Sequence, residues 1–132
     1  MLIEVLLLQI LERPLHWQRS VAWALLVGLM IALFHVGSQP GAGGLFPSGW
    51  DKLVHVLYFG GIAALAYVGT GSRRPIFSIV LIAFFGMLDE VGQSFNPSRV
   101  SSAADWVADI AGAGLAVVFL KLVAAHLRAR HD

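Results

Sequence analysis

The chain has 132 residues and a formal charge of +1, and hydrophobic residues make up 58% of it while charged residues make up only 13%. Soluble globular proteins have about 45–50% apolar and about 25% charged residues, so this composition indicates a membrane protein rather than a soluble domain. The near-neutral charge argues against nucleic acid as a partner, and the absence of cysteine excludes disulfides, thiolate catalysis and zinc–sulfur sites.

The first predicted element covers residues 2–12, an apolar run interrupted by Glu4 and Gln9. It is too short to cross a bilayer core, which requires about 20 apolar residues. We expect it to form a helix in the cytoplasmic interface, with Trp17 as an aromatic anchor. The segment has neither a basic leader nor an A-x-A cleavage signal, so we do not expect a removable signal peptide.

Four apolar segments, at about 20–37, 51–69, 75–94 and 103–125, are each long enough to span a bilayer. The links between them are short and rich in glycine and proline, which end helices. Links of this kind permit only antiparallel neighbours. We therefore predict one all-α domain over residues 1–132, an integral membrane four-helix bundle with short loops and an N-terminal interfacial helix.

Basic residues predict the orientation, because cytoplasmic loops of membrane proteins carry an excess of Lys and Arg. With the N-terminus in the cytoplasm, seven of the nine basic residues are cytoplasmic and only Lys52 and Arg99 lie outside. Trp50 and Trp106 then lie near the outer boundary, where aromatic belts occur. We expect a multi-pass protein with both termini in the cytoplasm.

Acidic residues concentrate toward the outer face of the last three spans, where five of the eight carboxylates occur: Asp51, Asp89, Glu90, Asp105 and Asp109. A charge at mid-bilayer costs roughly 2.5–3.5 kcal/mol on insertion scales, so the presence of each of these acids in a span needs a structural or functional explanation. At about 1.5 Å per residue, His55 lies about 6 Å below Asp51, and Glu90 lies at a similar depth in the next span. Three helices therefore bring polar groups to one level, and we expect a single polar cluster there.

Residue spacing places these groups on shared helix faces. Asp51, His55 and Tyr58 follow the i, i+4, i+7 pattern of one face, and Gln93 lies three residues after Glu90. Both faces can therefore point toward the same cavity.

A stripe along the last span is polar at its outer end and small below, with Asp105 and Asp109 followed by Gly112 and Ala116. Small residues allow helices to approach closely, so we expect the polar half to line a cavity and the small half to pack against another helix. We expect Ser102 to be the N-cap residue of this span, with Asp105 completing an S-x-x-D capping box.

An ordered set of polar motifs runs through these spans: D-K-x-x-H-x-x-Y from Asp51 to Tyr58, E-x-x-Q-x-F-x-P-x-R from Glu90 to Arg99, and Asp105 six residues later. The set resembles the VanZ-like family of small bacterial membrane proteins, whose founding member is associated with reduced susceptibility to the glycopeptide teicoplanin. Asp109 stands where the family commonly has Asn, and Ser98 stands where Gly is common. The resemblance implies a bacterial cytoplasmic membrane protein with an outward-facing site for a cell-envelope ligand, and it implies no particular reaction.

The residues expected to bind ligand are the polar members of this set: Asp51, Lys52, His55, Tyr58, Glu90, Gln93, Arg99, Asp105 and Asp109. His55, Glu90 and Asp105 are also the candidates for catalysis, because His and carboxylates are the usual acid–base groups. Asp89 ranks below Glu90, since it can instead cap the local network or face a water-filled mouth.

Several of these residues also have structural interpretations. His55 can act as a neutral hydrogen-bonding residue between helices, while Lys52 and Arg99 can either neutralise nearby acids or bind an anionic group such as a lipid phosphate. Carboxylates with one His can hold Mg²⁺ or Mn²⁺. Because no compact motif such as H-E-x-x-H is present, we expect neither a metal nor another cofactor.

Three classes of function follow. The first, which we favour, is binding of a lipid-linked or peptidoglycan-related ligand from the outer leaflet, with membrane lipid as a partner and an effect on glycopeptide susceptibility. The second is an enzyme acting on a lipid-linked phosphate or glycan, with His55 and Glu90 as the acid–base pair and Arg99 holding the anion. The third is an ion or proton pathway, which requires a polar lining on both sides of the membrane, whereas the inner halves of the spans are apolar or small. The sequence sets no oligomeric state.

Overall fold

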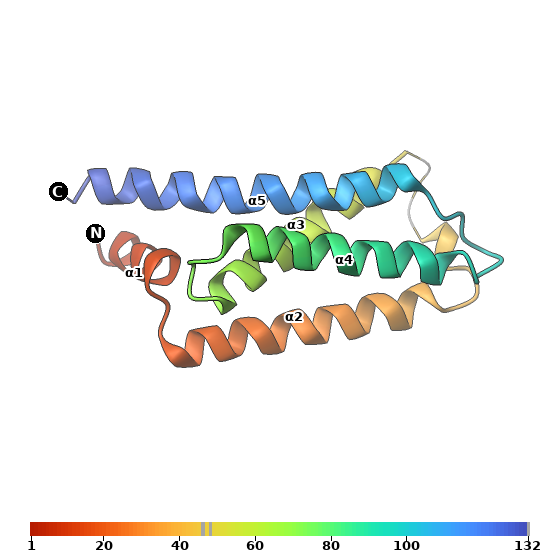
Figure 1. Ribbon diagram of the computed structural model, residues 1–132, viewed down its shortest axis with the longest axis horizontal. Helices are drawn as coiled ribbons and strands as arrows, with labels where there is room; N and C mark the ends of the chain where they lie inside the picture. The colour runs from red at the N-terminus through yellow and green to blue at the C-terminus, as the bar shows by residue number, and fades with distance from the viewer. Residues whose placement is uncertain (46, 48, 132) are drawn as a thin grey trace.

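The computed structural model describes residues 1–45, 47 and 49–131. Its elements are α1 (Leu2–Glu12), α2 (His16–Gly37), the short 3-10 helix η1 (Ala42–Gly44), α3 (Asp51–Gly69), α4 (Pro75–Gln93) and α5 (Ala103–Ala129). Four of them, α2 to α5, are long and apolar enough to cross a membrane, and each runs antiparallel to the next along the chain (Figure 1). The prediction of an all-α four-helix bundle is confirmed, and the chain has the architecture of a multi-pass membrane protein.

Two helix ends differ from the predicted boundaries. α2 begins at His16 rather than near residue 20, two residues after the proline at position 14. The amide of Leu15 donates to Gln18 Oε1 at 2.8 Å and closes the first turn. α5 continues past residue 125 to Ala129, giving 27 residues. A helix of that length measures about 40 Å, more than the bilayer core of about 30 Å, so one end of it extends beyond the membrane.

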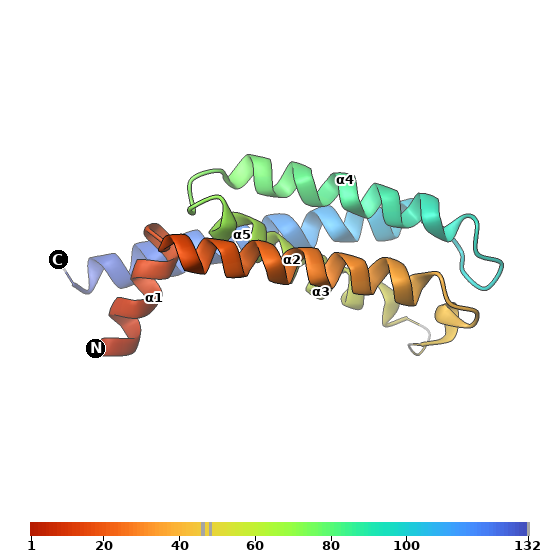
Figure 2. The same cartoon turned by 90° about the horizontal axis from the view of Figure 1, so that it is seen from below.

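α1 lies across the end of the bundle that holds both termini (Figures 1 and 2). Arg128 pairs with Glu12, and Arg130 Nη1 lies 2.8 Å from Glu4 Oε1. The N-terminal ammonium, 3.2 Å from Glu4, and then Arg130 lower the pKa of the Glu4 carboxyl. The predicted helix over residues 2–12 is therefore present, and ion pairs fix it to the last turns of α5.

Glycines allow α3 and α5 to pack with their backbones close together. A Cβ on Gly60 would lie 3.1 Å from the carbonyl oxygen of Gly112, and a Cβ on Gly112 would lie 2.8 Å from Val56 Cα. The small half of the predicted stripe on α5 thus forms a helix-packing surface, as expected. This approach also brings His55 of α3 next to Asp109 of α5.

The middle of the bundle is an apolar core, formed by Leu26, Met30, Phe59, Ile62, Ala63, Ala66, Tyr67, Ile82, Ala113 and Val117. Indole groups join neighbouring helices around it: Trp23 Nε1 donates to Gly69 O at 3.0 Å, and Trp106 Nε1 donates to Ala83 O at 2.8 Å. Trp106, expected in an outer aromatic belt, therefore also connects α5 to α4.

Candidate functional site

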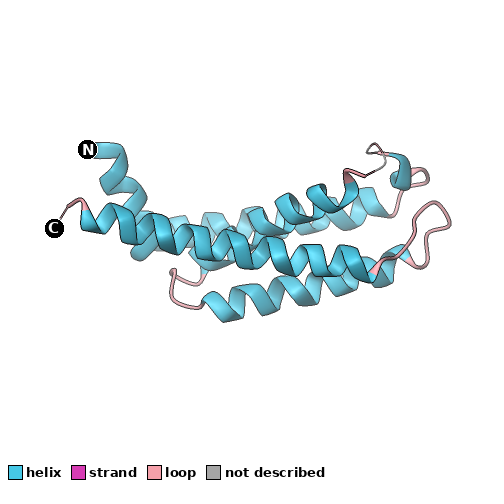
Figure 3. Ribbon diagram, turned by 90° about the horizontal axis from the view of Figure 1, so that it is seen from above, coloured by secondary structure: helices cyan, strands magenta, loops and turns pink. Residues whose placement is uncertain are grey.

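The polar cluster lies at the end of the bundle opposite both termini, where α3 and α5 begin and α4 ends (Figures 1 and 3). Within the part of the chain that the structure describes, every buried polar side chain except Ser78 belongs to it. His55, Glu90 and Asp105 each offer one ligand atom, and these three atoms lie within 4.8 Å of one another. The three candidates for catalysis, which come from three helices, are thus brought together and are 8%, 7% and 6% exposed.

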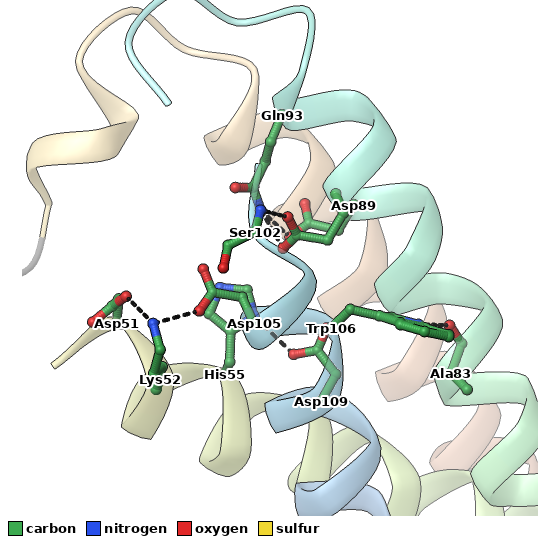
Figure 4. Close-up of polar contacts among 11 residues, drawn as sticks. Asp51, Lys52, His55, Ala83, Asp89, Gln93, Ser102, Asp105, Trp106 and Asp109 are labelled. Carbon is green, nitrogen blue, oxygen red and sulfur yellow. Dashed lines mark hydrogen bonds and ion pairs between the residues drawn. The ribbon is translucent and has the colours of Figure 1, made fainter. Parts of the chain in front are cut away.

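His55 is held in one orientation by contacts on two sides. Its Nδ1 lies 2.7 Å from Asp109 Oδ1, and its ring stacks on Phe59 with the centroids 5.9 Å apart. When Asp109 is ionised its carboxylate only accepts hydrogen bonds, so Nδ1 then carries the proton of this pair and Nε2 is available to bind a proton or a ligand. Figure 4 shows the ring between the carboxylates of Asp105 and Asp109.

Asp109 has no exposed surface, and its second oxygen, Oδ2, has no hydrogen-bond partner among the residues described. This oxygen faces Gly86 of α4, where a Cβ would lie only 2.5 Å away. Gly86 therefore provides the space that Asp109 occupies. No sequence signal identified this glycine, because its role depends on a helix distant in the chain.

Glu90 accepts hydrogen bonds on both oxygens. The backbone amide of Ser102 donates to Oε2 at 2.6 Å, and Gln93 Nε2 donates to Oε1 at 3.2 Å. The same Gln93 nitrogen donates to Asp89 Oδ2 at 2.8 Å. Glu90 thus joins the end of α4 to the start of α5, and all its hydrogen-bond donors in the described chain are neutral.

The capping box predicted at the start of α5 is wrong. Ser102 makes no side-chain capping bond. The backbone amide that the box would use donates to Glu90 Oε2 instead. Asp105, the other half of the box, accepts from Lys52 Nζ at 3.0 Å, and Lys52 also contacts Asp51 at 3.1 Å (Figure 4).

A cavity of about 650 Å³ lies between the polar cluster and α2. Its polar lining comprises Asp51, His55, Tyr58, Asp89, Gln93, Ser98, Arg99 and Asp105, and its apolar lining includes Leu29, Ala32, Leu33 and Val36 of α2. Six of the predicted ligand-binding residues thus reach the cavity, whereas Lys52, Glu90 and Asp109 do not line it. Sequence reasoning missed the wall from α2, because a uniformly apolar span does not reveal which of its residues face a cavity.

Two polar residues of the cavity wall differ in their availability to a ligand. Tyr58 donates its hydroxyl to Leu29 O at 2.6 Å and so holds α3 against α2. Arg99 is half-buried and makes no ion pair with any residue that the structure describes. Its guanidinium lies against Gly37, where a Cβ would be 2.9 Å from Nη1. Arg99 is therefore the cation on this wall that remains available for an anion.

Comparison with known proteins found no matching family model, no matching curated protein and no matching solved structure. The chemistry of the site is therefore inferred from the positions of its side chains and the lining of its cavity. A cavity with a guanidinium and an imidazole on one wall and aliphatic side chains on the other can bind an amphiphile. An imidazole with a free Nε2 can also transfer a proton.

Proposed function

We propose that this protein binds the polar end of a lipid or lipid-linked envelope ligand in the cavity between α2 and the polar cluster. The observation that carries the proposal is the two-sided lining of the cavity, with His55, Arg99 and Asp105 opposite Leu33 and Val36. An amphiphile can contact both walls favourably. Its head group can hydrogen-bond to the polar wall, and its chain can cover the apolar wall and so remove apolar surface from water. Ligand cavities measure about 300–1,000 Å³, and this cavity falls within that range.

The same proposal places the cavity in the outer leaflet of a bacterial cytoplasmic membrane. The excess of basic residues at the other end of the bundle supports this orientation. The resemblance of the polar motifs to the VanZ-like family supports an envelope ligand. We further propose, on that resemblance, that producing the protein lowers the susceptibility of a bacterial host to teicoplanin.

Native mass spectrometry of the purified protein with added polyprenyl phosphate tests the binding function. The wild type should retain the lipid, while Arg99→Gln, which removes a charged donor, should bind about tenfold more weakly. Ala32→Phe should also bind weakly, because the new ring fills the cavity. Arg73→Gln, which removes an exposed arginine at the other end, is the matched control and should bind like the wild type. Equal retention by all four proteins would contradict the proposal.

A second function, acid–base catalysis on the same class of ligand, is favoured by the hydrogen bond between His55 and Asp109. A buried carboxylate on Nδ1 orients an imidazole so that Nε2 can take a proton from an attacking water or hydroxyl. Glu90, the acid of the predicted pair, does not line the cavity, so His55 carries this second function. Phosphate release from a polyprenyl diphosphate tests this function, since His55→Gln should stop release and still bind the lipid. Binding without release by the wild type would leave only the first function.

A further inference from the structure

We propose that His55, Glu90 and Asp105 form a site for one divalent metal ion, and that Asp109 is the residue that orients His55 toward it. One imidazole and two carboxylates are a mixed nitrogen and oxygen donor set, which suits Mn²⁺ and also Zn²⁺. Two ligands bound to one such ion at about 2.0–2.2 Å lie at most about 4.4 Å apart. Because the three donor atoms already lie within 4.8 Å of one another, small side-chain rotations are enough to close the site.

The unused nitrogen of His55 is an observation independent of the acids. The side chain is 8% exposed, and Nδ1 is engaged by Asp109, which lies outside the proposed ligand set. Nε2 makes no hydrogen bond to any residue in the described part of the chain, although the ring lines the cavity beside Asp105 (Figure 4). Metal-binding histidines almost always have a carboxylate or carbonyl on their other nitrogen. His55 has this arrangement, with Asp109 on Nδ1 and no hydrogen bond from a described residue to Nε2.

The charge balance of the cluster also favours a cation. Five carboxylates gather at this end of the bundle, and they are accompanied by only two permanently charged cations, Lys52 and Arg99. Glu90 and Asp105 are buried side by side, and the described donors to Glu90 are neutral. Buried charges are costly unless they are paired or coordinate a metal. A divalent ion between Glu90 and Asp105 would neutralise both.

The contacts already present are compatible with metal binding. Of the two oxygens of Asp105, Lys52 contacts only Oδ1. The Lys52 side chain is 54% exposed, so it can move toward water when an ion binds. The hydrogen bonds from Ser102 and Gln93 hold Glu90 in place, as supporting residues do for ligating carboxylates. Each carboxylate oxygen has two lone pairs, so a hydrogen bond does not prevent coordination.

Mn²⁺ binding to the purified full chain, freed of metal with a chelator, tests the proposal without any lipid. Electron paramagnetic resonance follows the loss of free Mn²⁺, and we expect one ion per chain with a nitrogen coupling from imidazole. Glu90→Gln and Asp105→Asn should each weaken binding at least tenfold, and His55→Gln should remove the nitrogen coupling. Glu12→Gln, which removes a carboxylate at the other end, is the matched control and should bind like the wild type.

Asp109 is tested as a positioning residue by two substitutions of similar size. Asp109→Asn keeps an oxygen that accepts the Nδ1 proton and should bind Mn²⁺ within a few-fold of the wild type. Asp109→Leu removes the acceptor and should weaken binding about 10–100-fold. The nitrogen coupling is measured on the wild-type protein alone, so the proposal can still be tested if a substitution prevents folding. Wild-type binding without nitrogen coupling, or no binding, would overturn the metal site and leave lipid binding to be judged by its own experiment.

Discussion

His55 is the residue at which the contacts of the cluster converge. Asp109 binds one ring nitrogen, Phe59 stacks on the ring, and the donor atoms of Glu90 and Asp105 lie within 4.8 Å. A histidine that serves only to join helices needs one partner, and the hydrogen bond to Asp109 already provides it. The two further acids beside the ring therefore point to ligand or proton chemistry.

Neutral replacements separate this role from a structural one. Glu90→Gln and Asp105→Asn keep the shape of each side chain, and interhelical polar contacts in membranes average only about 0.6 kcal/mol. We therefore expect the free energy of unfolding to change by about 1 kcal/mol or less, while ligand binding and any teicoplanin phenotype are lost. Drug susceptibility should be measured in cells, together with the amount of protein in the membrane. Full activity in both variants would show that the charges are not needed.

Asp109→Asn should be tolerated, unlike the changes at positions 90 and 105. The amide oxygen of Asn can still accept the proton of His55 Nδ1, and the substitution removes a buried charge whose Oδ2 has no partner among the described residues. We expect unchanged or slightly higher thermal stability and retained activity. A loss of activity at normal protein levels would mean that the charge of Asp109, and not only its oxygen, is required.

At the scale of elements, the cluster depends on the close packing of α3 and α5. Gly112→Ala should separate these helices, because the new Cβ would lie 2.8 Å from Val56 Cα. Overpacking of this kind costs about 1–3 kcal/mol, which thermal unfolding can detect. Ligand binding should fall as well, since His55 and Asp109 lie on the separated helices. Gly114→Ala is the control, as nothing lies within 4 Å of a Cβ there, and an equal effect of both substitutions would argue against the packing explanation.

The contact between α1 and α5 should depend on pH. The N-terminal ammonium and Arg130 lower the pKa of Glu4. The pair between Glu4 and Arg130 therefore stabilises the contact at neutral pH and is lost as the pH falls through this lowered pKa, below the usual 4.5. Hydrogen exchange, corrected for the intrinsic rate, should show protection of α1 decreasing over this range. Glu4→Gln should lower protection at neutral pH and reduce the pH dependence. Unchanged dependence in that variant would assign the effect to another group.

Much of this arrangement follows from the sequence, because span length and short links determine which residues share a depth. His55, Glu90 and Asp105 could be placed at one level for that reason alone. The start of α5 at residue 103 was predicted correctly, but its capping box was not, because the distant carboxylate of Glu90 accepts from the Ser102 amide. The wall from α2 was not predicted either, because Leu33 and Val36 resemble their lipid-facing neighbours in every local property.

At the scale of the whole molecule, the two ends of the bundle have different chemistry. One end holds five of the eight carboxylates and the cavity. The other end holds both termini and α1 (Figure 1). Between them the buried core is apolar in the chain that the structure describes, apart from Ser78, which bonds to Arg74 O in its own helix. An ion or proton pathway therefore lacks a polar lining along this stretch, and a site open to one side fits better.

Cysteine labelling tests which side the site faces, and the chain has no native cysteine to interfere. Ser101→Cys lies at the end with the cavity and His131→Cys at the end with the termini, and both positions are exposed. In intact cells, an impermeant thiol reagent should label the first and spare the second. The reverse pattern would place the cavity in the cytoplasmic leaflet and exclude an outer-leaflet ligand.

The central claim, that an amphiphile occupies the cavity, is tested most directly by photocrosslinking in native bacterial membranes. Benzoylphenylalanine at Ala32, which lines the cavity, should give an adduct enriched in a phosphate-bearing envelope lipid when analysed by mass spectrometry. The same group at Leu122, exposed on α5, should give only the bulk phospholipid mixture. Loss of the enriched adduct in the Arg99→Gln variant would link it to the polar wall. Identical adducts at both positions would contradict a specific ligand in the cavity.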